Sequence, residues 1–406
     1  MKRFFVLVLC LLIPDLQGEP HIYTGDRIAI VGNTFADQLR IHGYLETLLR
    51  QRLDVSVRNL GWAGDMLSAR DRPTGFATEE STLTDHKTDL IIACFGMGES
   101  FAGEPGLPRF KSDLESFILS HSGKKYNGES EVRLILVSPI ANEDLGKLTH
   151  ALEKRNAELE AYTKVMGEVA ANAQVPFIDL FKPSRKLMGD RSGPHLTVNG
   201  ITLNQLGYWA ICNVFYEQLA DEIRNPWEII IDANDLKGNS DGVEVSEIST
   251  EKNGINFEVI EQSAPSLLPP GDNDLPSQLE VLRDRLKVTN LEAGEYTLSV
   301  DGIEIVTAKH DQWAKGIAVD ASPSHEESEV LREAINDKNL QFTYGWKALN
   351  QVHIVGERKH SPSGQALPEE LIEFYKLAED REASLSKYKI NLPKKRQWRL
   401  APAKKD

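Results

Sequence analysis

Five stretches of the chain carry the polar residues that could do chemistry. They are Gly32–Thr34, Asn59–Asp65, Phe95–Ser100, Pro139 and Asn199–Asn204. A threonine hydroxyl such as that of Thr34 is a potential nucleophile, and backbone N–H groups beside loop glycines can hold an oxyanion. The carboxylates of Asp65 and Glu99 could bind sugar hydroxyls or a cation, or act as an acid/base pair. His195 lies just before the last stretch and is a candidate base.

These stretches follow apolar runs that predict β-strands, or precede a helix. The runs are Arg27–Val31, Val55–Asn59, Leu90–Phe95, Val132–Ser138 and Phe177–Leu180, and helical spacing of apolar residues fills 36–53, 110–119, 150–173 and 204–224 between and after them. Near-continuous apolar strands that alternate with helices indicate a parallel sheet covered on both faces. Residues 22–224 are therefore predicted to form a three-layer, doubly wound α/β domain. Its loops at the carboxyl ends of the strands would meet in one site.

In order and approximate spacing, the series between Gly25 and Tyr216 resembles the four signature blocks of the SGNH (GDSL) hydrolases, a family of esterases and carbohydrate deacetylases. The family pattern is Gly-Asp-Ser after the first strand, a loop glycine after the second, Gly-x-Asn-Asp after the third, and Asp-x-x-His before the last helix. The resemblance implies a flavodoxin-like fold and a nucleophile–His–Asp triad. It also implies an oxyanion hole made by the nucleophile N–H, the loop glycine N–H and the asparagine side chain.

The side chains of this sequence depart from that pattern at most positions. Thr34 stands in the serine slot and Gly64 keeps the loop glycine, whereas Gly98 replaces the asparagine, Asn199 the aspartate and Thr202 the histidine. Loss of one oxyanion donor typically lowers the rate ~10²–10³-fold, and threonine cannot act as a base near neutral pH. The resemblance thus predicts impaired or lost triad catalysis, with a retained cleft that binds a carbohydrate, an acylated sugar or a partner.

Several alternatives stay open at this point. The chain could be an active ester hydrolase that removes acyl groups from sugars, using Thr34 and a rearranged base such as His195, or His195 could simply be solvated. Asn33 or Thr34 could cap the following helix, Asp65 could cap another, and Glu99 could accept backbone N–H bonds. The cleft could also be vestigial, with function in the second half of the chain. No metal-ligand spacing, phosphate loop or dinucleotide fingerprint is present, so no metal or cofactor is predicted.

Residues 225–390 have a different texture and are predicted to form a β-rich accessory region with helices. Strand-like runs include Glu228–Asp232 and Gly254–Ile260, and Asp301-Gly302 is a hairpin signal between two more. This half resembles the accessory region of some large secreted bacterial SGNH members. Residues 391–406 are basic and contain proline, which predicts a solvated tail.

The composition limits the location and partners of the chain. Residues 1–18 combine Lys2 and Arg3 with an apolar run of about ten residues, which predicts a cleaved signal peptide and an exported, periplasmic or secreted protein. No later segment predicts a transmembrane span. The net charge of −15 argues against nucleic acid as a partner. Cys94 and Cys212 lie in apolar runs, which indicates buried thiols rather than a bridge. The sequence specifies no oligomeric state.

Overall fold

The computed structural model describes residues 21–72, 76–189, 193–220, 226–251, 254–271, 275–347 and 356–404. The expected signal peptide, residues 1–18, lies outside the described residues and stays a prediction, as does the domain boundary at 224/225. Within the described ranges, no helix combines the length and apolarity needed to cross a membrane.

The apolar runs of the first half form a five-stranded sheet. All four strand pairings are parallel and the strand order is β2-β1-β3-β4-β5. Every residue of β3 is buried, as expected for a strand covered on both faces. The predicted doubly wound α/β class is confirmed. The strands are β1 (Arg27–Gly32), β2 (Ser56–Asn59), β3 (Leu90–Cys94), β4 (Arg133–Val137) and β5 (Phe177–Ile178).

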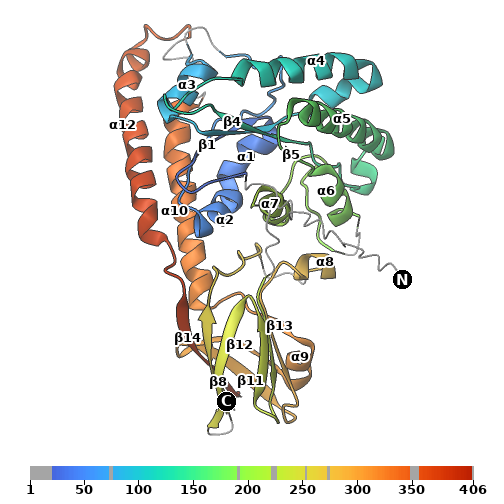
Figure 1. Cartoon of the computed structure of the whole chain (residues 1–406), viewed down its shortest axis with the longest axis vertical. Coiled ribbons are helices and arrows are strands. Elements are labelled where there is room, and N and C mark those ends of the chain that lie inside the picture. Colours follow the sequence, from blue (N-terminus) through green and yellow to red (C-terminus); the bar gives the residue numbers. More distant parts are fainter. Residues whose placement is uncertain are drawn as a thin grey trace, which may run out of the picture.

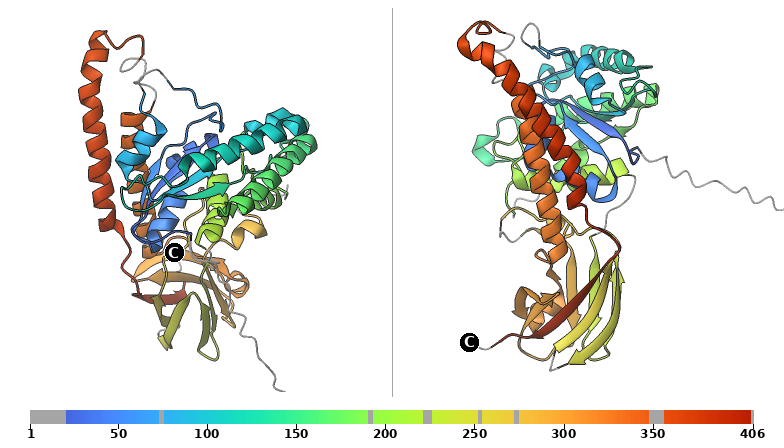
Figure 2. Two further views of the ribbon diagram at one scale, coloured as in Figure 1. Left: turned by 45° about the horizontal axis from the view of Figure 1, so that its top comes forward. Right: turned by 90° about the vertical axis from the view of Figure 1, so that its left-hand side faces the viewer.

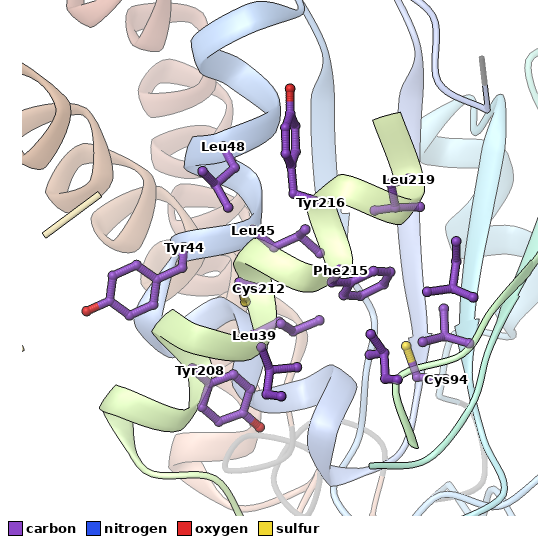
Figure 3. Packing of buried hydrophobic residues seen from close by; sticks show 14 of the residues in the cluster. Leu39, Tyr44, Leu45, Leu48, Cys94, Tyr208, Cys212, Phe215, Tyr216 and Leu219 are labelled. Atoms are coloured by element: carbon purple, nitrogen blue, oxygen red, sulfur yellow. The ribbon is translucent and has the colours of Figure 1, made fainter. Parts of the chain in front are cut away.

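Helices cover both faces of this sheet (Figure 1). One face packs against α1, α2, α6 and α7, and the other packs against α3, α4 and α5. Figure 3 shows the first contact, where Tyr208, Cys212 and Phe215 of α7 lie against Leu39 of α1 and Leu45 of α2. The helices are α1 (Thr34–His42), α2 (Tyr44–Arg52), α3 (Glu79–His86), α4 (Gly103–His121), α5 (Leu152–Ala173), α6 (Phe181–Leu187) and α7 (Gln205–Ala220), with short 3-10 turns η1 (Glu99–Ala102) and η2 (Gly146–Leu148).

The single helix predicted over residues 36–53 is two helices. Gly43 has φ 67° and its N–H donates to the carbonyl oxygen of Leu39, which ends α1 and starts α2 in a new direction. This left-handed conformation favours glycine. Apolar spacing alone did not reveal the break, because both helices bury residues against the same sheet face.

The second half forms two further sheets that enclose a core containing Trp227, Trp313 and Trp398. The predicted hairpin at Asp301-Gly302 joins β11 and β12, with both turn residues at positive φ. Four strands follow the order β13-β10-β6-β7 and five follow β12-β11-β14-β9-β8. They are β6 (Glu228–Asp232), β7 (Lys237–Asp241), β8 (Val243–Glu251), β9 (Gly254–Glu261), β10 (Arg285–Thr289), β11 (Glu295–Val300), β12 (Ile303–Lys309), β13 (Ile317–Ala318) and β14 (Lys394–Pro402).

The predicted solvated tail at 391–406 is wrong for its described part, because β14 lies between β11 and β9 in the five-stranded sheet. Trp398 and Leu400 alternate into the core. Basic residues earlier in β14 pair with acids: Lys395 with Glu258, and Arg396 with Asp301. A charge run that looks solvated by composition is therefore neutralised by partners remote in sequence.

Two long antiparallel helices link this sandwich to the α/β domain (Figure 2). In the first, Lys338 is buried and its Nζ donates to Glu46 Oε1 of α2 at 2.6 Å and to the carbonyl oxygen of Val57 at 2.9 Å. Val57 belongs to β2, the strand at one edge of the sheet. The two long helices therefore cover an edge that would otherwise be exposed. The helices of this half are α8 (Ser277–Glu280), α9 (His310–Lys315), α10 (Pro323–Trp346) and α12 (Pro362–Ser384), with the 3-10 turn η4 (Leu385–Tyr388).

Candidate functional site

The carboxyl ends of the parallel strands surround one cavity of about 270 Å³. It is bounded by residues from the loops after β1, β2, β3 and β4 and from the loop before α7. Of the nine site residues predicted from the sequence, six line it: Asn33, Thr34, Gly64, Asp65, Gly98 and Thr202. The remaining three, Glu99, Asn199 and His195, are not among its lining residues.

The turn after β1 places Thr34 at the first position of α1. Asn33 is the N-cap, and its Oδ1 accepts a hydrogen bond from the Phe35 N–H at 3.0 Å. Gly32 has φ 131°, and a Cβ there would collide with the carbonyl oxygen of Cys94 on β3. The sharp turn therefore requires glycine, and it presents the Thr34 side chain to the cavity at a helix N-terminus.

The loop after β2 supplies Gly64 and Asp65. Gly64 has φ 89°, a conformation that favours glycine, and space for a side chain is open above it. Asp65 is buried and does not cap a helix. Its two oxygens accept from the Arg72 guanidinium at 2.9 and 2.7 Å, and this guanidinium lies 4.0 Å from the Trp62 ring centre. Among the described residues that line the cavity, Asp65 is the one carboxylate, and a paired arginine neutralises it.

The loop after β3 holds Gly98 and Glu99 in different environments. A Cβ on Gly98 would lie 2.7 Å from Met66 Cγ, so Met66 occupies the place where the family's asparagine side chain would begin. Glu99 accepts from the N–H groups of Leu67 and Gly96 at 2.8 and 2.9 Å. The expected backbone-bonding role of Glu99 is confirmed. Burial raises the pKa of the Glu99 carboxyl, although these backbone bonds lower it.

The loop before α7 brings Thr202 to the cavity. Asn199 is exposed, and its Oδ1 accepts from the Thr202 N–H at 2.7 Å, so it shapes the turn. Glu143, from the loop after β4, fixes the start of the same loop. Its buried carboxylate accepts from the N–H groups of Leu196 and Thr197 at 3.0 and 2.8 Å.

His195 points toward Glu143, with Nδ1 3.3 Å from Glu143 Oε1 and 57% of its side chain exposed. It therefore lies on the loop that carries Thr202 but outside the cavity lining. Among the described residues that line the cavity there is no histidine. The Cys94 thiol and the Tyr208 hydroxyl of this lining stay protonated and so cannot accept a proton, because burial raises the pKa of both groups.

In the described part of the chain, no group of three His, Cys, Asp or Glu residues could hold a metal ion. Cys94 and Cys212 are both free and buried, as the sequence indicates.

Sequence reasoning missed residues whose role depends on contacts between loops. Met66 and Glu143 are the main examples, since one fills the space beside Gly98 and the other anchors the loop of Thr202. Phe101 was also missed; it lines the cavity while 63% exposed. The sequence offered one signal for these residues: Glu143 is an acid that follows Pro139 shortly after the carboxyl end of a predicted strand.

The strand order and the cleft at the carboxyl ends of the strands define a doubly wound α/β protein. Residues 24–210 match the family model described as GDSL-like Lipase/Acylhydrolase family. This match confirms the predicted resemblance of the α/β domain to the SGNH (GDSL) hydrolase family. No protein of curated function matches the sequence.

Solved structures extend the likeness. A gut microbial diltiazem-metabolizing enzyme is similar with a TM-score of 0.67 at 18% identity, over 94% of this chain and 98% of that one. An acetylxylan esterase from Geobacillus stearothermophilus matches with a TM-score of 0.38 at 17% identity, over 49% of this chain and 96% of its own. An alpha/beta hydrolase enzyme from the metagenome of Lake Arreo, Spain, gives 0.38 at 15%, over 51% and 100%. The first match covers the accessory region as well and establishes the fold alone.

Proposed function

We propose that this chain is a ligand-binding member of the SGNH family in which triad ester hydrolysis is impaired or lost. The observation that carries the proposal is the cavity lining around Thr34. The loop glycine Gly64 is kept, but Thr202 occupies the histidine slot and the carboxylate of Asp65 is paired with Arg72. A hydroxyl of ordinary acidity needs a neighbouring base to act as a nucleophile. The cleft therefore retains shape without the proton transfer that hydrolysis requires.

An active ester hydrolase with a rearranged base is the second candidate. It is favoured by the His195–Glu143 pair, because a histidine held by a carboxylate is the usual form of a general base. For this mechanism His195 would have to turn away from Glu143 and reach the Thr34 hydroxyl. The exposure of His195 leaves it room to rotate.

An esterase assay separates the two candidates. The purified chain, Thr34→Ala and His195→Ala would each be tested with p-nitrophenyl acetate against buffer alone. We expect equal rates in all four samples. Turnover that either substitution abolishes would overturn the binding proposal and support the hydrolase.

A restored chain provides the positive control for the assay. Thr34→Ser, Asn199→Asp and Thr202→His together return the family's triad residues to their places in the sequence, and Thr34 and Thr202 already line the cavity. We expect this variant to gain turnover above buffer. Its activity would show that the assay detects hydrolysis on this scaffold, so that a null result for the natural chain has meaning.

Export is proposed on the sequence alone. If residues 1–18 are removed as a signal peptide, the mass of the protein recovered outside the cytoplasm should correspond to a chain that begins near residue 19. The full-length mass would contradict the proposal.

A further inference from the structure

The walls of the cavity are mostly apolar. Aromatic and aliphatic side chains come from the start of α1, from the segments that follow β3 and β4 and from the loop before α7, among them Phe35, Phe95, Met97, Phe101, Ile140 and Leu203. Phe101 is 63% exposed, which places it at the open side. A ligand that enters past Phe101 meets carbon atoms on most sides, and apolar surface favours burial there.

Most polar groups of the lining are already satisfied by the protein. The Asn33 oxygen accepts from the Phe35 N–H, and the Tyr208 hydroxyl donates to the Phe35 carbonyl oxygen at 3.2 Å. The Ser138 hydroxyl donates to the Pro139 carbonyl oxygen and accepts from the Leu180 N–H. These groups have little hydrogen-bonding capacity to offer a ligand. A polar ligand would lose its hydration without equivalent replacement.

Charge is also balanced in the lining. Asp65 and Arg72 form a two-pronged ion pair, and the thiol of Cys94 is buried and neutral because burial raises its pKa. Among the described residues of the lining, the hydroxyl groups of Thr34 and Thr202 and the amide nitrogen of Asn33 are the side-chain groups for which the protein shows no such partner. They suit one or two hydrogen bonds to a small uncharged group.

The asparagine position of the family's oxyanion hole, Gly98 in this chain, is closed by the Met66 side chain. Gly98 brings no side chain, and Met66 Cγ and Sδ lie 2.7 and 3.0 Å from the place of a Cβ there. Met66 is held in place, since its N–H and carbonyl both bond to the backbone of Ala69. The family's amide donor is therefore replaced by a thioether, which prefers apolar and aromatic neighbours.

We propose that the cavity binds the uncharged aryl group of a small molecule, and neither a sugar ring nor an ion. The inference rests on the proposed binding function and deepens it by naming the ligand class. An apolar cavity of about 150 Å³ is enough to hold benzene, and this one is about 270 Å³. This aryl ligand replaces the carbohydrate expected from the family resemblance, because a sugar in the cavity would bury several hydroxyls against carbon.

Calorimetric titration with benzyl alcohol, benzoate and xylose tests this ligand class. We expect benzyl alcohol to bind at least about tenfold more tightly than either benzoate or xylose. Ile201→Trp fills the cavity from its lining and should weaken benzyl alcohol about tenfold or more. Val198→Trp is the matched control, since Val198 lies on the same loop, is 64% exposed and is not a lining residue. It should leave binding unchanged.

A second variant guards against misfolding of the first. Phe101→Ala changes an exposed side chain at the open side and should weaken benzyl alcohol by about two- to tenfold through loss of ring contact. Unchanged binding in both Ile201→Trp and Phe101→Ala, or no binding of benzyl alcohol by the natural chain, would overturn the inference.

The remaining outcomes separate this inference from the proposed function. Xylose binding that Ile201→Trp abolishes would refute the aryl ligand while leaving a binding cleft in place. Ester turnover that depends on Thr34 would refute the binding function, whatever the result with benzyl alcohol.

Discussion

Gly98→Ala should change the sign of its effect on stability when Met66 is shortened. Gly98 has φ −66° and ψ −44°, a conformation that alanine adopts readily. By backbone entropy alone, alanine would stabilise the fold by about 0.4–1 kcal/mol. Its Cβ would nevertheless lie 2.7 Å from Met66 Cγ, and such overpacking costs about 1–3 kcal/mol.

The expected net effect in the natural chain is a loss of about 0.5–2 kcal/mol. In a Met66→Ala background the contact is gone, so the same Gly98→Ala change should gain about 0.4–1 kcal/mol. The coupling between the two sites would then be about 1–3 kcal/mol, within the range for residues in direct contact.

Urea unfolding of the natural chain, Gly98→Ala, Met66→Ala and the double variant measures this double-mutant cycle. Hydrogen exchange of peptides from β1 and β3 would report on the α/β domain separately from the sandwich, since a chain with two cores need not unfold in one step. If Gly98→Ala stabilises both backgrounds equally, Met66 moves aside at no cost. The inference that Met66 closes the position of the family's asparagine would then be wrong.

Three further predictions concern the elements that hold the site. Glu143→Gln removes one of the two carboxylate oxygens that hold the loop of Thr202, which should cost about 1–3 kcal/mol of stability. Hydrogen exchange of the Leu196 and Thr197 N–H groups, which Glu143 binds, should then speed up, and unchanged exchange would refute the anchoring role. Lys338→Met removes one of the cations paired with Glu46 and Glu382, which keep Arg50 as a partner. It should cost about 3–5 kcal/mol in urea unfolding, against less than about 1 kcal/mol for the same change at the exposed Lys154. Burial alone would raise the pKa of the Glu382 carboxyl, but Lys338 and a neighbouring arginine lower it from 4.5 to about 2. The stability that this carboxylate contributes is therefore full above pH 4.5 and is lost as the pH falls through 2. A urea midpoint that does not change between those two pH values would contradict this prediction.

The β-type pattern of the first half was enough to predict the sheet and the place of the site. The strand β3 is apolar throughout, and the loops that follow β1, β2 and β3 carry polar residues of the site. In a parallel sheet those loops must meet at one edge, so sequence order determines proximity. The prediction failed where a single residue reverses the chain, as at Gly43, because a helix break changes direction without changing apolar spacing.

The structural role of the basic segment that forms β14 could not be predicted from composition. Arg396 is buried because Asp301, Glu261 and Glu327 reach it from three other elements. Charged residues are normally exposed unless they are paired. The pairing here spans up to 135 positions in the sequence (396 − 261), and only folding brings the partners together.

The sequence by itself determined the α/β class, the edge of the sheet that carries the site, and the absence of the family's histidine and asparagine at Thr202 and Gly98. Those properties follow from residue types and from local periodicity. Tertiary structure alone decided what the substituted positions face: Met66 beside Gly98, Arg72 on Asp65, and Glu143 on the loop of His195. The reason is that a side chain's chemistry is set by its neighbours, and these neighbours come from loops whose contacts no local pattern encodes.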